Sequence, residues 1–143
     1  MSYDRADWHY CGDFPRDLPP EAGGTHIGMF LAWAILRGLE GDLHREDSVE
    51  SLRAVRERRM TGRDFLFREC DEKFTGEDLN EEGNAFTKAY FEKDGPEGYL
   101  ADYEQALGNN IPTLYHVEDT WEAFDKLASV LDKRLAEWRR RTS

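Results

Sequence analysis

The segment from Ile27 to Leu36 constrains the fold more than any other feature of the sequence, because it is the most apolar stretch of a polar chain. Its apolar side chains fill most of the circumference of a helix instead of one stripe, which is typical of a helix buried on all sides. The segment has about half of the ~20 residues that a membrane span needs, and Arg37 follows it. We therefore predict a buried central helix over about residues 25–40, with Thr25 as its N-cap and Gly41 as its stop.

Four capping signatures predict the starts of further helices. In each of them an Asp or Thr that can cap a helix stands three positions before an acid that can bond back to it. The pairs are Asp47 with Glu50, Thr61 with Asp64, Asp78 with Glu81, and Asp119 with Glu122.

The last third of the chain predicts two more helical segments. Pro96 suits a first helical position, and apolar residues from Tyr99 to Leu107 precede a stop at Gly108. From Trp121 to Trp138, apolar residues recur at intervals of three and four, which is the pattern of an amphipathic helix. Between the two segments, "LGNNIPTLYHVED" predicts a loop with a short extended piece at residues 113–117.

The first 22 residues differ in kind from the rest. Three prolines exclude a long helix there, yet Trp8, Tyr10, Phe14 and Leu18 are too apolar to stay in solvent. We predict an extended arm over residues 1–22 that packs against a helical body over residues 23–143. Because 143 residues fit one domain, the sequence predicts an all-α single domain of five or six helices around the central helix.

Charge is unevenly distributed along the chain. The formal net charge is −11, and twelve acids against three lysines between Glu69 and Glu104 account for nine of these negative charges. Such a surface repels polyanions, so we expect neither nucleic acid nor an acidic membrane as a partner. The start "MSYDRADWHY" has neither a basic region nor an apolar run after it, so we expect no signal peptide and a cytoplasmic protein.

His26 is the first candidate for chemistry, because it follows a Gly-Gly pair at the start of the central helix. Free N–H groups of a first helical turn can hold an anion there. However, no basic residue lies nearer than Arg16 or Arg37, and the phosphate-loop pattern is missing. A structural, hydrogen-bonded His26 is the preferred interpretation.

A metal site would have to gather His9, Cys11, His26, Cys70 and His116. Structural zinc sites usually have closely spaced ligands at both ends, and this set has only one such pair, so we predict neither a metal nor a cofactor. Cys70 is interpreted as an inert buried thiol instead of a nucleophile, because it falls on the apolar side of a helix. The sequence predicts no catalytic residue, and we do not expect an enzyme.

Several long motifs resemble a family of small acidic bacterial proteins. The motifs are "DWH", "GDFPRDLPPEAGGTHIGMFLAWAI", "LNEEGNAFTKAYF" and "YLADYEQAL", and they cover most of the chain. The family is loosely associated with toxin–immunity gene pairs. The resemblance implies an immunity-type protein that neutralises a cognate toxin with a basic surface by stoichiometric binding.

The residues expected to bind this partner come from the acidic segment: Glu69, Asp71, Glu72, Glu77, Asp78, Glu81, Glu82, Phe91 and Tyr99. Charge complementarity accelerates association, and aromatic side chains provide binding hot spots. The other interpretation of the aromatic residues is that they form the core. The alternative function is a small-molecule or anion-binding domain, or an enzyme built on one, with a pocket at Trp8, His9 and His26.

Overall fold

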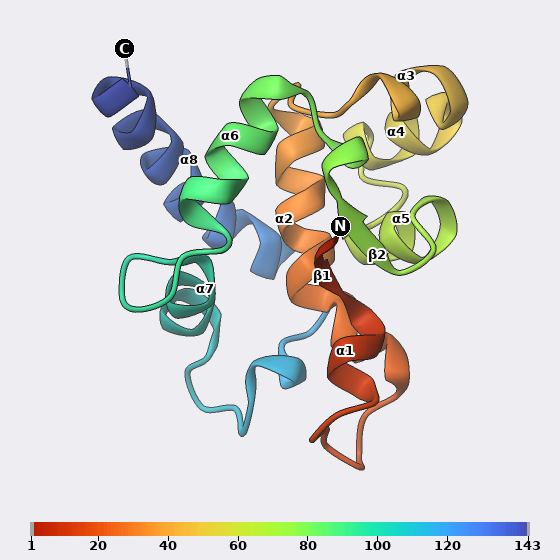
Figure 1. Ribbon diagram of the computed structural model, residues 1–143. Coiled ribbons are helices and arrows are strands. Elements are labelled where there is room, and N and C mark those ends of the chain that lie inside the picture. Colours follow the sequence, from red (N-terminus) through yellow and green to blue (C-terminus); the bar gives the residue numbers. More distant parts are fainter. Residues whose placement is uncertain (1, 143) are drawn as a thin grey trace.

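The computed structural model describes residues 2–142, and α2 (Thr25–Leu36) runs through the middle of the molecule (Figure 1). The other helices are α1 (Ala6–Tyr10), α3 (Asp42–Asp47), α4 (Val49–Arg56), α5 (Gly62–Glu69), α6 (Glu81–Tyr90), α7 (Tyr99–Leu107) and α8 (Trp121–Thr142). Three short 3-10 helices are η1 (Pro20–Gly24), η2 (Gly76–Asp78) and η3 (Leu114–His116), and the strands are β1 (Ser2–Arg5) and β2 (Lys73–Thr75). The predicted helical architecture is confirmed, although the described part has eight α-helices instead of five or six, and a two-stranded sheet besides.

The predicted central helix is confirmed, because every residue of α2 from Thr25 to Ile35 is buried. Its ends differ from the prediction. The N-cap is Gly24, and the helix stops at Leu36, where Gly38 has a φ of 73° and the Leu39 N–H donates to the Ala34 carbonyl at 2.8 Å. Glycine adopts this left-handed conformation readily, so Gly38 and not Gly41 ends the helix.

Helices α3, α4 and α5 lie on one side of α2, and α6, α7 and α8 lie on the other (Figure 1). The closest crossing joins α2 to α5, where a Cβ on Gly62 would overlap the backbone carbonyl of Gly28. On the other side, aromatic rings of α6 and α7 pack against Phe30 and Trp33 of α2. One cluster of buried apolar residues therefore has α2 as its axis.

The N-terminal arm is extended only at its start. β1 pairs antiparallel with β2, with Asp4 opposite Phe74, and α1 then packs against η1. A Cβ on Gly23 of η1 would lie 3.0 Å from the Ala6 carbonyl oxygen and 3.3 Å from His9 Cβ, so glycine allows the close approach. The predicted packing of the arm is confirmed, but the prediction of extended backbone over residues 1–22 is wrong at residues 6–10, which form α1, and at residues 20–22, which belong to η1.

One of the four predicted caps is confirmed: the Thr61 hydroxyl accepts from the Asp64 N–H. The other three predictions are wrong, because α4, α6 and α8 begin later, after Ser48, Asn80 and Thr120. Asp78 instead accepts from the backbone N–H of Thr75 in a capping box around η2. Asp119 instead accepts from the Thr61 hydroxyl at 2.7 Å.

The C-terminal helices follow the sequence pattern. The predicted helix from Trp121 is α8, and α7 ends at Gly108 as predicted, although it begins at Tyr99 and leaves Pro96 outside. Residues 114–116 form the 3-10 turn η3, so the extended piece predicted at residues 113–117 is wrong at its centre, and only Thr113 and Val117 on either side are extended. None of the helices between residues 2 and 142 combines the length and the apolar character that crossing a bilayer requires.

Candidate functional site

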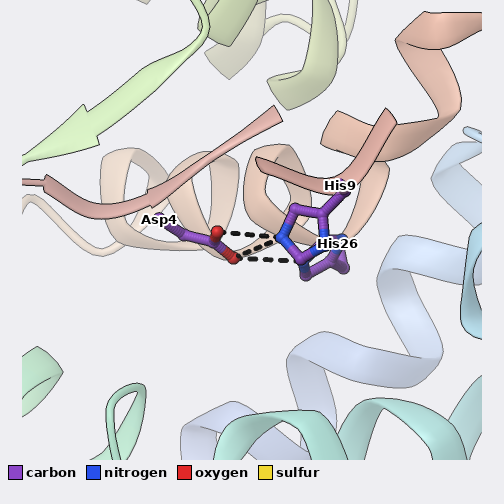
Figure 2. Close-up of side chains that lie close together, drawn as sticks. All are labelled: Asp4, His9 and His26. Atoms are coloured by element: carbon purple, nitrogen blue, oxygen red, sulfur yellow. Dashed lines mark hydrogen bonds and ion pairs between the residues drawn. The ribbon is translucent and has the colours of Figure 1, made fainter. Parts of the chain in front are cut away.

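Three side chains with chemistry-bearing atoms meet where β1, α1 and α2 come together. The Asp4 carboxylate lies 2.8 Å and 3.0 Å from His9 Nε2 through its two oxygens, and 3.2 Å from His26 Nε2. Figure 2 shows both imidazole rings turned toward this single carboxylate. We call Asp4, His9 and His26 the Asp–His–His cluster.

Local structure explains why these three residues meet. Pairing of β1 with β2 fixes the position of Asp4, and the turn of α1 brings His9 back beside it. His26 lies in the first turn of α2, where its side chain is fully buried. The His9 and His26 rings meet edge to face with centroids 4.6 Å apart. A strand, a short helix and the central helix therefore each contribute one residue.

A fourth residue supports the cluster from behind. The Tyr115 hydroxyl lies 2.7 Å from His9 Nδ1, and the Phe14 ring packs against the Tyr115 ring. When His9 donates from Nε2 to Asp4, its Nδ1 accepts the Tyr115 hydroxyl proton. By contrast, His26 Nδ1 is buried and has no hydrogen-bond partner among the described residues.

The environment determines the charge of the cluster. Burial raises the pKa of Asp4, but the hydrogen bonds from His26 and His9 outweigh burial and hold that pKa well below its ordinary value. Burial lowers the pKa of His26, and the Asp4 carboxylate offsets only part of this effect. At neutral pH the cluster therefore pairs an ionised carboxylate with a neutral His26 imidazole. These are the forms of both groups that bind a cation.

A second cluster lies under α3 and consists of His44, Cys70 and Asp78. His44 Nε2 is 2.7 Å from an Asp78 oxygen, and the Cys70 thiol donates to the same oxygen at 3.4 Å. His44 Nδ1 bonds to the Ser48 hydroxyl at 3.0 Å. Burial and the negative Asp78 raise the pKa of the Cys70 thiol far above its ordinary value, so the thiolate needed for nucleophilic attack is disfavoured.

The five residues considered for a metal from sequence do not form one site. Only His9 and His26 meet; Cys11 is exposed, Cys70 lies in the second cluster, and His116 Nε2 is 3.0 Å from an Asp17 oxygen. Sequence reasoning missed Asp4, His44 and Asp78 as cluster members. Asp4 stands five positions before His9, and the two side chains meet only because the chain changes from strand β1 to helix α1 between them, which the sequence does not reveal.

Three residues expected to contact a partner, Asp78, Phe91 and Tyr99, are buried and so are not part of the surface. Phe91 and Tyr99 stack on one another in the core at 5.0 Å, and Asp78 belongs to the second cluster. Their burial follows from packing around α2, which takes up every aromatic ring from Phe74 to Tyr103. The core interpretation of these aromatic residues is therefore correct.

The remaining residues of the expected surface are distributed between bonded and exposed positions. Glu69 accepts from the Ser51 hydroxyl, Glu72 accepts from the Tyr10 hydroxyl, Asp71 pairs with Lys73, and Glu82 pairs with Arg139. Glu77 and Glu81 are exposed. In the alternative pocket, His9 and His26 lie together, whereas the Trp8 side chain points outward and is 55% exposed.

Replacement of His26 by glutamine is expected to lower the free energy of unfolding by about 1–3 kcal/mol, because the largely buried Asp4 carboxylate loses a ring N–H donor. Urea denaturation followed by circular dichroism measures this change. His116→Gln is the control, since the Asp17 side chain that bonds His116 is 70% exposed, and it should change stability by less than about 0.5 kcal/mol. A His26→Gln variant as stable as the parent would contradict a structural His26.

Comparison with known proteins places the cluster inside one family domain. Comparisons with curated proteins and with solved structures found no match. A family profile described as a domain of unknown function, DUF7832, matches residues 2–117, a span that includes Asp4, His9, His26 and Tyr115. Since the match covers well over half of the chain, this protein belongs to the DUF7832 family.

Proposed function

We propose that the protein acts by stoichiometric binding of a basic protein partner, in the form of an immunity protein that occludes a cognate toxin. One observation supports this proposal most. Five exposed carboxylates between α5 and the end of α7 make no ion pair with a described residue: Glu77, Glu81, Glu92, Asp94 and Glu104. These five residues are called the unpaired acidic set.

The unpaired acidic set repels itself, and folding does not require it. Other exposed acids of the same segment are neutralised locally, as Glu97 is by Lys93 and Glu82 by Arg139. Unpaired like charges on one segment destabilise the compact state slightly, but they accelerate association with a partner of opposite charge. The same charges that lower the stability of the isolated fold slightly would therefore speed its association with a basic partner by electrostatic steering.

The proposal predicts steered association that depends on the unpaired acidic set. Reversal of Glu77, Glu81, Glu92 and Glu104 to lysine should reduce the association rate with the cognate toxin by about tenfold or more. Stopped-flow fluorescence at low and at physiological salt measures this rate. Salt should slow association of the parent protein more than it speeds dissociation, because the Debye length shrinks to about 8 Å.

The matched control reverses four exposed acids that also make no described ion pair and lie outside the segment: Glu46, Asp47, Glu118 and Glu122. Both variants change the net charge equally, and each includes one acid in the first turn of an α-helix, Glu81 or Glu122. Equal effects of the two variants, or a salt-independent association rate, would refute the proposed surface and leave the acids as a solubility device.

The Asp–His–His cluster favours ligand binding as a second candidate function. The structure brings together His9 and His26, two of the three residues considered for a pocket, and adds an ionised carboxylate between them. Asp4 and His9 remain partly exposed, so the edge of the cluster borders solvent.

A further inference from the structure

The Asp–His–His cluster has the dimensions of a metal site. One Asp4 oxygen and one ring nitrogen each of His9 and His26 all lie within 4.8 Å of one another. When a tetrahedral metal has bonds of about 2.0–2.1 Å to its ligands, neighbouring ligand atoms are about 3.3 Å apart. The carboxylate lies 2.8 Å from one imidazole and 3.2 Å from the other, so small outward movements would accommodate an ion.

We propose that Asp4, His9 and His26 bind one divalent transition-metal ion, with Zn²⁺ as the ion that fits best. This inference rests on the second candidate function and names its ligand. Two imidazole nitrogens and one carboxylate oxygen suit zinc and other first-row divalent ions, whereas Mg²⁺ and Ca²⁺ prefer all-oxygen sites.

The three side chains differ in how deeply they are buried, and this difference suits a metal site. The His26 side chain is fully buried and anchored in α2, while Asp4 and His9 remain 13% and 19% exposed. The rigid ligand lies on the inner side of the ion, and the exposed edge gives the ion a path from solvent. Three protein ligands leave a coordination position for water, as in zinc sites that bind or activate a small molecule.

Tyr115 supplies the outer contact that metal-binding histidines usually have. Histidine that binds a metal through Nε2 carries its proton on Nδ1 and donates it to a neighbouring group. The Tyr115 hydroxyl lies 2.7 Å from His9 Nδ1 and becomes the acceptor of that proton. Tyr115 is therefore a positioning residue: it holds the His9 ring without contacting the ion.

The second cluster of histidine, thiol and carboxylate is the natural competitor, but its hydrogen bonds are already complete. His44 Nδ1 bonds to Ser48, and the second Asp78 oxygen accepts from the Thr75 N–H. The His44 and Asp78 side chains are only 1% and 5% exposed, so two of the three ligands are closed to solvent and Cys70 alone is partly exposed. We therefore interpret the second cluster as a hydrogen-bonded polar part of the core.

Zinc titration of the full chain, stripped with a chelator and followed with a chromogenic competitor, tests the proposal. The parent protein should bind one Zn²⁺ per chain. Asp4→Asn and His9→Ala should each weaken binding by more than about 100-fold, and Tyr115→Phe by about 10–100-fold. Cys70→Ser is the control for the second cluster and His116→Gln the control for surface histidines; both should bind like the parent.

X-ray absorption of the zinc-loaded parent protein keeps the test independent of whether the variants fold. The spectrum should show two imidazoles and no sulfur ligand at about 2.3 Å. Any sulfur ligand would overturn the proposal, and loss of binding in Cys70→Ser would assign the ion to the second cluster. Absence of stoichiometric uptake, or uptake that persists in folded His9→Ala and Asp4→Asn, would also overturn it. None of these outcomes bears on toxin association through the unpaired acidic set, so the two proposals fail separately.

Discussion

Replacement of Gly62 by alanine is expected to lower the free energy of unfolding by about 3 kcal/mol or more. A Cβ at this position would overlap the Gly28 carbonyl of α2 and lie 2.8 Å from Ala32 Cβ. Since the overlapping atom is backbone, no side-chain rotation relieves the contact. Helices α2 and α5 would have to separate, which disturbs the core around Phe65 and Leu66. Urea denaturation followed by circular dichroism measures the change.

Gly76→Ala is the matched control for this prediction. The φ of Gly76 is not in the left-handed region, and the nearest atom to its added Cβ would be an Asn84 side-chain oxygen at 3.5 Å, an ordinary contact. This variant should change stability by less than about 1 kcal/mol, and in the stabilising direction if the unfolded chain loses more freedom. Similar losses in both glycine variants would mean that the α2–α5 contact is more adaptable than its backbone geometry indicates.

The periodicity of apolar residues predicted the helices that are buried either on all sides or along one face. α2 is apolar on all sides and lies fully inside, and α8 keeps one apolar face from Phe124 to Leu135 against the core. Capping patterns were less informative, because the same residue types serve other partners. Asp78 closes the turn of η2 and Asp119 bonds to Thr61, so their side chains were not free to begin the predicted helices.

The candidate site was predictable by residue type but not by arrangement. His26 was recognised from its place at the start of the most apolar helix, and His9 from its place in the arm. Asp4 was missed because its role depends on pairing of β1 with β2, two short strands about 70 positions apart in sequence with no alternating pattern to reveal them. His44 and Asp78 were missed for the same reason, since 34 positions separate two residues that bond directly.

The acidic segment shows why charge counted along a sequence is not charge on a surface. Asp78 and Asp102 are buried with partners of their own, and five more acids accept hydrogen bonds or form ion pairs near the surface, namely Glu69, Asp71, Glu72, Glu82 and Glu97. The aromatic side chains interleaved with them turn inward toward Phe30. The sequence alone does not show which of these acids and aromatic side chains face solvent and which face the core, because acids and aromatic residues alternate along the same amphipathic helices.

Replacement of Arg134 by methionine is expected to lower the free energy of unfolding by about 3 kcal/mol. The guanidinium donates to both Asp102 oxygens at 2.8 Å and 3.0 Å, and the Tyr90 hydroxyl donates to the same carboxylate at 2.6 Å. Asp102 is 4% exposed, so the variant leaves a buried carboxylate with Tyr90 as its remaining side-chain donor. The Arg134 side chain is 26% exposed, which places the loss at the lower end for buried pairs.

Arg139→Met is the matched control, because Arg139 also binds a carboxylate through two bonds, but both it and Glu82 are about half exposed. The control should lose less than about 1 kcal/mol. Adding Asp102→Asn to Arg134→Met should recover part of the loss, since a neutral amide costs less to bury than a charge. Equal losses in the two arginine variants would mean that water reaches Asp102.

The Arg134–Asp102 ion pair also joins two parts of the chain that the family match separates: α8 lies beyond the matched residues 2–117, whereas Asp102 lies within them. A large loss in Arg134→Met would therefore mean that this buried ion pair makes α8 an integral part of the fold built on the DUF7832 domain.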